Sequence, residues 1–478
     1  MAIVNTETFI RDFTKELTEH NAAVFAGAGL SVPLGFVDWR GLLKPLAEEL
    51  ELDVDRETDL VRVAQYHVNH HQNRADLTDV ILNNFSRKIA TVTENHKILA
   101  RLPIETYWTT NYDQAIEDAL RGSGKLPDVK HSNDDLPRTL HGRDAVVYKM
   151  HGDKDDAANA VLCKEDYETY HLKRGDFLTA LAGDLIGKMF LFIGFGFSDP
   201  NLDYVLSRLY TRHGKNQRKH FCFVKRESSN APGNDADLSY RKAKQNLFIR
   251  DLERYNIRAV MVDQYDEVTE ILRQVESRYK NRTVFISGAA HDYGRYTAND
   301  ALDFVHKLSS QLVAKNFRLV TGLGVGIGSI VVDGALQQIY QVQRRRLKDE
   351  LVIRPFPQSI AGQQLWTAYR EDMLDFSGLA IFMFGNKLQG DPPSVADSNG
   401  VIEEFEIAHN KGARVLPLGF TDFVARQLYD RVQAAFATYY PKATPSFKQL
   451  YALLGDPSRT LDQQLQTTVD ALSELQRM

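Results

Sequence analysis

The 478-residue sequence has few cysteines and no large excess of charge of either sign. Its two cysteines, Cys163 and Cys222, form no CxxC pair, which excludes a zinc site built on four thiolates and a disulfide framework. With 58 basic and 63 acidic residues, the net charge is −5, so the chain lacks the excess of basic residues that is typical of proteins that bind nucleic acid or an anionic membrane. We therefore expect no metal, no nucleic-acid partner and a reducing, cytoplasmic location.

Long hydrophobic runs, a signal sequence and internal repeats are absent from the sequence as well. The longest notable apolar run, "MFLFIGFGF" (189–197), is far too short to span a membrane. The first residues, "MAIVNTETFIRDFTKE", have neither the basic region nor the apolar core of a signal peptide, so none is expected. No fixed-period repeat indicates a solenoid. The basic run 344–346 is followed at once by Asp349 and Glu350 and is expected to be a solvated face.

Short apolar runs alternate with segments of helical spacing along most of the chain. A chain of this length exceeds what one hydrophobic core usually holds. The alternation predicts an α/β protein with two doubly wound, Rossmann-like domains and mostly parallel sheets. The expected strands are 22–26, 106–110, 146–150, 189–194, 220–224, 257–262, 284–287, 318–321, 351–354, 379–384 and 413–417, and helical spacing is clear at 94–102 and 200–212.

Two segments place the domain boundary. The stretch 225–239 is polar and rich in turn-forming residues, which predicts a surface loop. A helical pattern over 266–280 then leads into a fresh apolar strand with a fresh glycine, so the domains are expected to be 1–282 and 283–478. The tail, 446–478, is expected to be a helix.

The stretch "AAVFAGAGLS" (22–31) places glycines directly after an apolar run. Glycine allows a sharp turn and the close approach of another molecule to the backbone. If a helix follows, its first N–H groups favour an anion. Two interpretations remain open: a phosphate-binding loop, or a tight turn between strand and helix with no ligand.

Two further motifs follow expected strands. Asn111 and Asp113 come directly after 106–110, in "TTNYD", and His151 follows 146–150, in "MHGD". Ligands of open parallel sheets bind outside the carboxyl ends of the strands, so the three motifs together favour one site. A histidine there can accept a proton from water or a ribose hydroxyl. Asp113 is equally suited to bind ribose or to cap the following helix.

In this order and at these separations, "GAGLS", "TTNYD" and "MHGD" resemble the nicotinamide-dinucleotide site of the sirtuin family over roughly 10–275. The stretch "GFGFSDPNL" (194–202) stands where that family has a glycine–serine loop near the adenosine ribose. The resemblance implies that Asn111 and His151 are catalytic and that backbone N–H groups of the glycine loop hold the pyrophosphate of NAD. The implied dinucleotide-binding residues are Gly27, Ala28, Gly29, Leu30, Ser31, Asp113, Gly194, Ser198 and Asn201.

The sequence departs from the sirtuins in one respect that bears on the reaction. The protein deacetylases of that family carry a zinc module with four cysteines, which helps to form the groove for an acyl-lysine peptide. This chain has too few cysteines to build it. Water is then the expected acceptor, with ADP-ribose and nicotinamide as products. The alternatives are a sirtuin-type protein deacylase or ADP-ribosyltransferase, and a non-enzymatic nucleotide sensor.

The second half contains a glycine-rich turn and a second resemblance. Glycines recur at every second position over 322–328, which suits either phosphate binding or a close crossing of strand and helix. Further on, "AYREDM", "LAIFMFGNK" and "NGVIEEFEIAHNKGARVLPLG" resemble the nucleotide-binding SLOG family. That resemblance implies ligand contacts at Gly288, Arg370, Lys387 and Glu404.

A sirtuin-like domain followed by a SLOG domain resembles the effector family of the Thoeris anti-phage system. The resemblance implies that the first domain destroys NAD and that the second detects a cyclic ADP-ribose isomer. It also implies a partner enzyme that makes this signal, and assembly as a homotetramer. NAD is thus expected as a substrate, and cyclic ADP-ribose as an allosteric activator.

Overall fold

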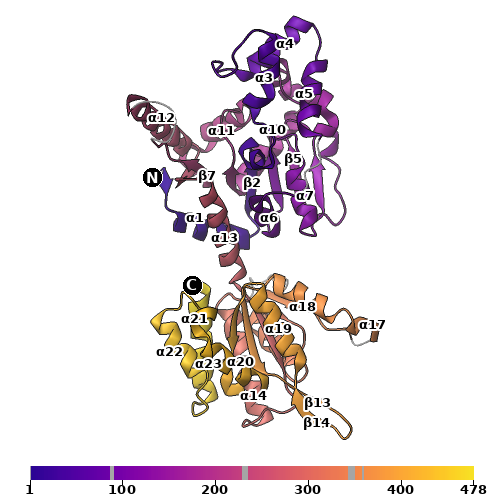
Figure 1. Ribbon diagram of the computed structural model, residues 1–478, viewed down its shortest axis with the longest axis vertical. Helices are drawn as coiled ribbons and strands as arrows, with labels where there is room; N and C mark the ends of the chain where they lie inside the picture. The colour runs from indigo at the N-terminus through magenta and orange to yellow at the C-terminus, as the bar shows by residue number, and fades with distance from the viewer. Residues whose placement is uncertain (1, 87–90, 229–234, 343–349, 358–359) are drawn as a thin grey trace. The chain divides into compact units, whose positions relative to one another are not determined.

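The computed structural model describes residues 2–86, 91–228, 235–342, 350–357 and 360–478 (Figure 1). The chain divides into two compact units, Met1–Glu276 and Ser277–Met478. Each unit has a parallel sheet covered by helices, so the predicted α/β class is confirmed. The boundary expected after residue 282 stays a prediction. The basic run 344–346 lies outside the described residues.

Within the described residues, the first unit contains an eight-stranded parallel sheet in the order β1-β8-β7-β6-β2-β3-β5-β4. Its strands are β1 (Ile3–Val4), β2 (Ala22–Ala26), β3 (Thr106–Thr109), β4 (Pro127–Lys130), β5 (Ala145–Lys149), β6 (Met189–Ile193), β7 (His220–Lys225) and β8 (Ile257–Val262). Sequence analysis missed β1 and β4, the two edge strands. All five residues of β2 are buried, as its unbroken apolar run requires.

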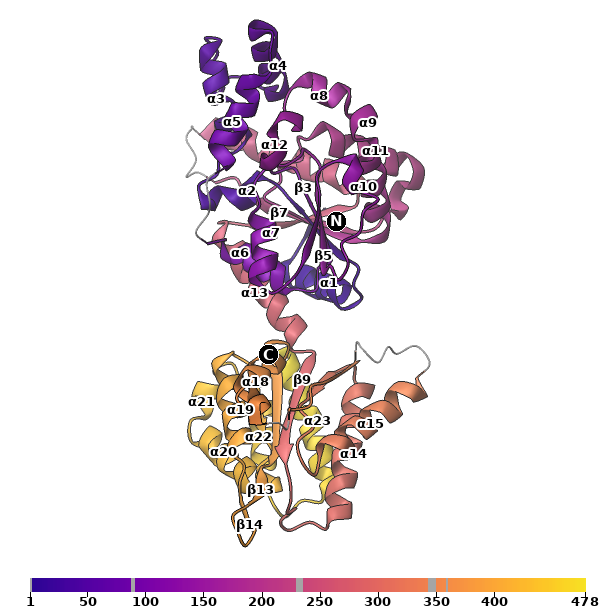
Figure 2. The ribbon, with the colours of Figure 1, turned by 90° about the vertical axis from the view of Figure 1, so that its right-hand side faces the viewer.

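The helices of the first unit lie on both faces of this sheet. Figure 2 shows α6 and α7 on one side and α10 and α11 on the other. The helices are α1 (Thr6–Thr18), α2 (Ala28–Ser31), α3 (Trp39–Glu49), α4 (Leu60–His71), α5 (Ala75–Phe85), α6 (Glu94–Arg101), α7 (Ala115–Gly122), α8 (Lys164–Glu168), α9 (Tyr170–Lys173), α10 (Gly175–Gly187), α11 (Pro200–His213), α12 (Asp235–Arg254) and α13 (Asp266–Lys280). Short 3-10 turns are η1 (Val32–Leu34), η2 (Asn133–Asp135), η3 (Lys154–Asn159) and η4 (Gly214–Asn216).

The order of strands places a topological switch point between β2 and β6. From β2 the chain goes to β3 on one side and later returns to β6 on the other. Ligands of doubly wound sheets bind at such a point, outside the carboxyl ends of the strands. The glycines that follow β2 and β6 therefore lie where a nucleotide site is expected.

Helices α3, α4 and α5 form an insertion between β2 and β3. The side chains of Asp38 and Asp59 cap α3 and α4 by accepting from backbone N–H groups three residues on. Apolar side chains on the inner faces build a small core of their own, with Leu43, Val63 and Ile81 fully buried. The insertion is thus an ordered helical segment attached to the sheet.

In its described residues, the second unit has a five-stranded parallel sheet in the order β11-β10-β9-β12-β15 and, beside it, the antiparallel hairpin β13–β14. The strands are β9 (Thr283–Ala289), β10 (Arg318–Thr321), β11 (Leu351–Ile353), β12 (Leu379–Phe384), β13 (Asn386–Gln389), β14 (Ser394–Asp397) and β15 (Arg414–Pro417). The chain passes from β9 to β10 on one side and later to β12 on the other, so the switch point lies between β9 and β12.

Helices cover both faces of this sheet too, with α14 and α15 on one face and α19 and α20 on the other (Figure 2). The bounds are α14 (Ala298–Ala314), α15 (Gly328–Gln341), α17 (Ile360–Gln363), α18 (Trp366–Asp375), α19 (Asn399–Asn410), α20 (Phe423–Ala434), α21 (Phe436–Tyr439), α22 (Pro445–Leu453) and α23 (Leu461–Arg477), with the 3-10 turn η5 (Gly419–Thr421). None of the helices in the described part of the chain is long and apolar enough to cross a membrane.

Two expectations about secondary structure were wrong in detail. The tail expected as one helix over 446–478 is two helices, because the chain turns between α22 and α23. The loop expected over 225–239 ends early, since α12 begins at Asp235, and its middle, 229–234, lies outside the described residues. Val469 and Leu472 of α23 belong to the core of the second unit, so the tail is part of the fold.

Candidate active site

The glycine loop after β2 packs against the loop after β6. The N–H groups of Gly27 and Gly29 donate to the carbonyls of Ile193 and Gly194, both at 2.9 Å. A Cβ on Gly27 would lie 2.5 Å from the Gly194 oxygen, and Gly194 has a positive φ of 63°. These glycines are therefore required for two strand ends to meet at the switch point.

The same contacts use N–H groups that were expected to hold a pyrophosphate. The N–H of Gly29 donates to Gly194, and that of Leu30 donates to the Gly27 carbonyl at 3.0 Å. The helix that follows, α2, has only four residues. Pyrophosphate binding by Ala28, Gly29 and Leu30 stays a prediction, and it requires the last two to exchange their hydrogen-bond partners.

Asn111 joins the end of β3 to the glycine loop. Its Nδ2 donates to the Gly27 carbonyl at 3.1 Å and to Ser31 Oγ at 3.2 Å, and its backbone N–H donates to Thr109 Oγ1 at 3.0 Å. The side chain is buried. The structure thus brings together three predicted site residues from two separate motifs.

His151 lies at the neighbouring strand end. Thr109 of β3 is in register with Lys149 of β5, and Asn111 and His151 each follow two residues later. His151 is only 1% exposed, and its carbonyl accepts from the Val161 N–H at 2.8 Å. Both residues expected to be catalytic are therefore fixed at the carboxyl ends of adjacent parallel strands.

The imidazole of His151 faces a carboxylate that sequence analysis missed. Its Nε2 lies 3.0 Å from Oδ2 of Asp199, the residue that caps α11 by accepting from the Leu202 N–H at 2.9 Å. Burial raises the pKa of Asp199, but His151, the Leu202 N–H and the Tyr167 hydroxyl outweigh burial and hold this pKa below its ordinary value. The available signal was a carboxylate in a glycine-rich loop directly after a strand.

The other predicted residues of this loop differ in burial. Gly194 and Ser198 are exposed, whereas Asn201 in the first turn of α11 is buried. The Nδ2 of Asn201 has no hydrogen-bond partner among the residues that the structure describes. A role for these three residues in binding dinucleotide stays a prediction.

A buried lysine links the two catalytic segments. Lys149 is fully buried, its Nζ lies 3.2 Å from Oε1 of Glu117, and it forms a second ion pair with Asp153. It also donates to the carbonyls of Tyr112 and Asp113, at 3.3 and 2.5 Å. Burial lowers the pKa of Lys149, but the surrounding carboxylates outweigh burial and raise it. The lysine therefore stays charged and ties the chain after β3 to the chain after β5.

Asp113 stands one residue before Gln114, the N-cap of α7. Its Oδ1 accepts from the Ala115 N–H at 3.0 Å, a local turn contact, and α7 has no side-chain cap hydrogen bond. A capping role for Asp113 stays a prediction. Ribose binding by the same carboxylate stays a prediction.

A small cavity lies beside Asn111. Its volume is about 30 Å³, and its walls come from the glycine loop, the insertion and the chain after β3. They include Ala28, Ser31, Trp39, Leu42, Phe85, Asn111 and Tyr112. Sites for drug-sized ligands measure about 300–1,000 Å³, so this hollow is much smaller than a whole ligand site.

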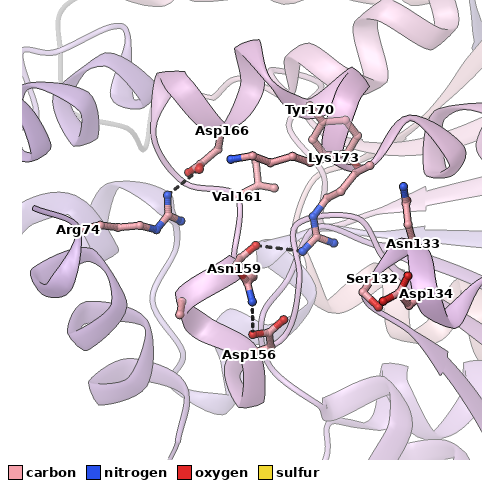
Figure 3. A pocket seen from close by; sticks show the side chains of 12 residues that line it. Arg74, Ser132, Asn133, Asp134, Asp156, Asn159, Val161, Asp166, Tyr170 and Lys173 are labelled. Carbon is pink, nitrogen blue, oxygen red and sulfur yellow. Dashed lines mark hydrogen bonds and ion pairs between the residues drawn. The ribbon is translucent and has the colours of Figure 1, made fainter.

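A larger pocket of about 450 Å³ lies behind Val161, whose N–H bonds the His151 carbonyl. Figure 3 shows Arg74 reaching Asp166 across one wall, a contact of 2.6 Å. Arg174 donates to the carbonyls of His131 and Asn159. Both arginines are thus hydrogen-bonded or ion-paired to oxygen atoms of the protein itself. For this reason we assign no ligand to this pocket.

In the second unit, three predicted residues gather at the switch point. Ser287, next to Gly288, donates from Oγ to Glu404 at 2.5 Å. Arg370 lies 3.4 Å from Glu404 and 2.8 Å from Glu403. Burial raises the pKa of Glu404, while Ser287 and Arg370 oppose this. The cluster is a buried, charged network at the carboxyl end of β9.

Lys387 and the glycine-rich turn have different surroundings from the residues of this cluster. Lys387 pairs with Ala396 across the β13–β14 hairpin, and among the described residues no hydrogen bond or ion pair joins it to the cluster. In the turn over 322–328, a Cβ on Gly324 would collide with the Gly288 carbonyl. That glycine serves a close crossing of backbones, one of the two interpretations that the sequence left open.

Comparison with known proteins agrees with this two-part architecture. A SIR2-like domain matches residues 105–259, and the Sir2- and TIR-associating SLOG family, STALD, matches residues 267–475. The fold and the two sites therefore define a SIR2-like domain joined to a SLOG domain.

Relatives that match nearly the whole chain identify the family within this class. The protein "NAD(+) hydrolase ThsA" of Bacillus cereus (strain MSX-D12) is 46% identical, over 97% of both chains. Proteins of the same name from Acinetobacter baumannii (strain 532279) and Cytobacillus dafuensis are each 43% identical, over 92% and 95% of this chain and 93% of their own. The chain belongs to this ThsA family of NAD(+) hydrolases.

One cluster of metal-ligand residue types occurs in the described part of the insertion. Glu49, His67 and His71 hold their ligand atoms within 4.8 Å of one another. His67 Nε2 lies 2.7 Å from Glu49 Oε2, a hydrogen-bond distance, and the other two side chains are exposed. The family implies no metal, and this cluster carries no metal assignment.

Proposed function

We propose that this chain hydrolyses NAD+ to ADP-ribose and nicotinamide at the site around Asn111 and His151. The observation that carries the proposal is the placement of these two buried side chains at adjacent strand ends, beside the glycine loop. Membership of a family of NAD(+) hydrolases supports the same reaction.

Each residue has a distinct task in this reaction. Breaking the bond between nicotinamide and ribose develops positive charge on the ribose, as in other glycosidic cleavages. Asn111 orients a ribose hydroxyl or the attacking water, and His151 accepts the proton that water loses. With two cysteines the chain lacks the four-thiolate module of the deacetylases, so water is the acceptor.

Asn111→Ala and His151→Ala test this assignment. Each variant should lose about 10²- to 10⁴-fold in nicotinamide release, the usual contribution of a positioned acid or base. Chromatography measures the nicotinamide, and circular dichroism checks the fold. Release that falls less than about tenfold in a folded His151→Ala protein would remove His151 from this role. An acyl-lysine peptide that loses its acyl group in the same assay would favour the deacylase instead.

We further propose that a cyclic ADP-ribose isomer, bound around Gly288, Arg370, Lys387 and Glu404, starts the hydrolysis. The small volume of the cavity beside Asn111, about 30 Å³, supports control by a conformational change that enlarges the site for NAD. An uncontrolled NAD hydrolase would drain the host. Activity that starts only on a signal suits anti-phage defence by NAD depletion, with a partner enzyme making the signal and the effector acting as a homotetramer.

Arg370→Ala tests the control step with cyclic ADP-ribose as the probe. The variant should keep basal nicotinamide release and lose the response, since its guanidinium lies in the buried cluster with Glu403 and Glu404. A coupling of about 1–3 kcal/mol corresponds to a change in affinity of roughly 5- to 150-fold. Arg354→Ala, at an exposed ion pair with Asp372, is the control. A normal response in Arg370→Ala would overturn the control step and leave the hydrolysis untouched.

A further inference from the structure

The two ring nitrogens of His151 have different surroundings. Nε2 lies 3.0 Å from Oδ2 of Asp199. Both ring nitrogens are buried, and neither makes a hydrogen bond among the residues that the structure describes, so the nearby carboxylate is what distinguishes Nε2 from Nδ1. A carboxylate beside one nitrogen favours a proton on that nitrogen, because the proton then lies next to negative charge. The neutral ring is thereby left with its lone pair on Nδ1.

Asp199 is itself held in place from two sides. Its Oδ1 accepts from the Leu202 N–H at 2.9 Å, and its Oδ2 accepts from the Tyr167 hydroxyl at 3.4 Å. The Tyr167 ring also meets the imidazole edge to face, with 5.5 Å between the ring centres. The Leu202 N–H and the Tyr167 hydroxyl both lower the pKa of Asp199, so they stabilise the charged form of this carboxylate whatever the charge on the ring. A fixed negative charge therefore faces Nε2.

We propose that Asp199 is a positioning residue that orients His151 and makes Nδ1 the base of the hydrolysis. This inference rests on the proposed NAD hydrolysis. A water oxygen bonds to the anomeric carbon, and the electrons of the carbon–nitrogen bond leave with nicotinamide. The water proton passes to Nδ1, and the carboxylate stabilises the imidazolium that forms without taking a proton from it.

Asp199→Asn removes the charge and keeps both the size of the side chain and an oxygen that can accept from the Leu202 N–H. We expect kcat to fall about 100-fold, which is the lower end of the range that a general base usually contributes. KM for NAD should change by less than about threefold.

Three further variants make the test decisive. Asp203→Asn is the matched control on α11, an exposed carboxylate beside the Tyr255 hydroxyl, and it should leave kcat unchanged. Asp199→Ser keeps a capping side chain without a charge and should behave like Asp199→Asn. Tyr167→Phe leaves the cap untouched and removes one contact of the carboxylate, so kcat should fall by less and KM should stay the same.

Each outcome has a defined meaning. Circular dichroism and thermal melting establish whether the variants fold. If both Asp199 variants unfold, kcat and KM of Tyr167→Phe test the inference, and an unchanged kcat overturns it. A folded Asp199→Asn protein with kcat within about threefold of wild type overturns the inference. So does a rise in KM at constant kcat. Wild-type protein that releases no nicotinamide would instead overturn the proposed function, and this inference with it.

Discussion

Replacing Lys149 by methionine removes a positive charge that is fully buried beside two carboxylates. Glu117 Oε1 lies 3.2 Å from the ammonium group, and Asp153 forms the second ion pair. The methionine side chain has a similar length and no charge. Both buried carboxylates then lose their counter-ion, and the carbonyls of Tyr112 and Asp113 lose a donor.

The cost follows from burial. Removing one partner of a buried ion pair destabilises a protein by about 3–5 kcal/mol, because the remaining charge stays uncompensated. A domain of 150–250 residues loses about 2–4 °C of melting temperature for each kcal/mol, so the transition of the first unit should fall by roughly 10 °C. Nicotinamide release should fall as well, since Lys149 ties the segment of Asn111 to that of His151.

Differential scanning calorimetry measures the transition. Lys188→Met is the control, because its ion pair with Asp184 is partly exposed and such pairs contribute about 0–1 kcal/mol. Adding Glu117→Gln to Lys149→Met removes one unpaired charge and should restore part of the stability. A Lys149→Met protein that melts no lower than the Lys188→Met control would refute the reasoning.

Two other predictions follow from contacts in the first unit. Gly27→Val should abolish NAD binding in calorimetry, because its Cβ would lie 2.5 Å from the Gly194 oxygen, whereas Gly122→Ala meets nothing within 4 Å and should bind normally. Burial raises the pKa of Asp166, but Arg74 and the N–H groups of Leu162 and Cys163 together outweigh burial and lower it, so the pair with Arg74 stabilises the fold above the ordinary carboxyl pKa and stops doing so as the pH falls. The melting temperatures of wild type and Arg74→Met should therefore converge on acidification from neutral pH, and a constant difference would contradict the assignment.

The strands and the positions of the motifs were predictable from the sequence because their signals are local. The apolar run at 22–26 coincides with β2, and Asn111 and His151 do follow strand ends. Such runs are buried on both faces of a parallel sheet, so their composition alone identifies them. The edge strands β1 and β4 were not predicted, since β1 has two residues and the sequence of β4, PDVK, contains no apolar run.

The partners of these residues depend on contacts between distant segments and were not predictable. The N–H of Gly29 donates to Gly194, far along the chain, so a loop with the composition of an anion site satisfies its own hydrogen bonds. Asp199 has the sequence signature of a helix cap, and only the approach of β5 to the start of α11 places His151 against it.

The small cavity beside Asn111 has a consequence for the cell under the proposed control. If substrate enters only a rare open form, background NAD loss is proportional to the fraction of open molecules, whatever the catalytic power of the site. Each tenfold change in that fraction corresponds to about 1.4 kcal/mol, so a bias of roughly 4 kcal/mol leaves about one molecule in a thousand open. The cell can then store about a thousandfold more enzyme, at the same background loss, than it could of a permanently open form.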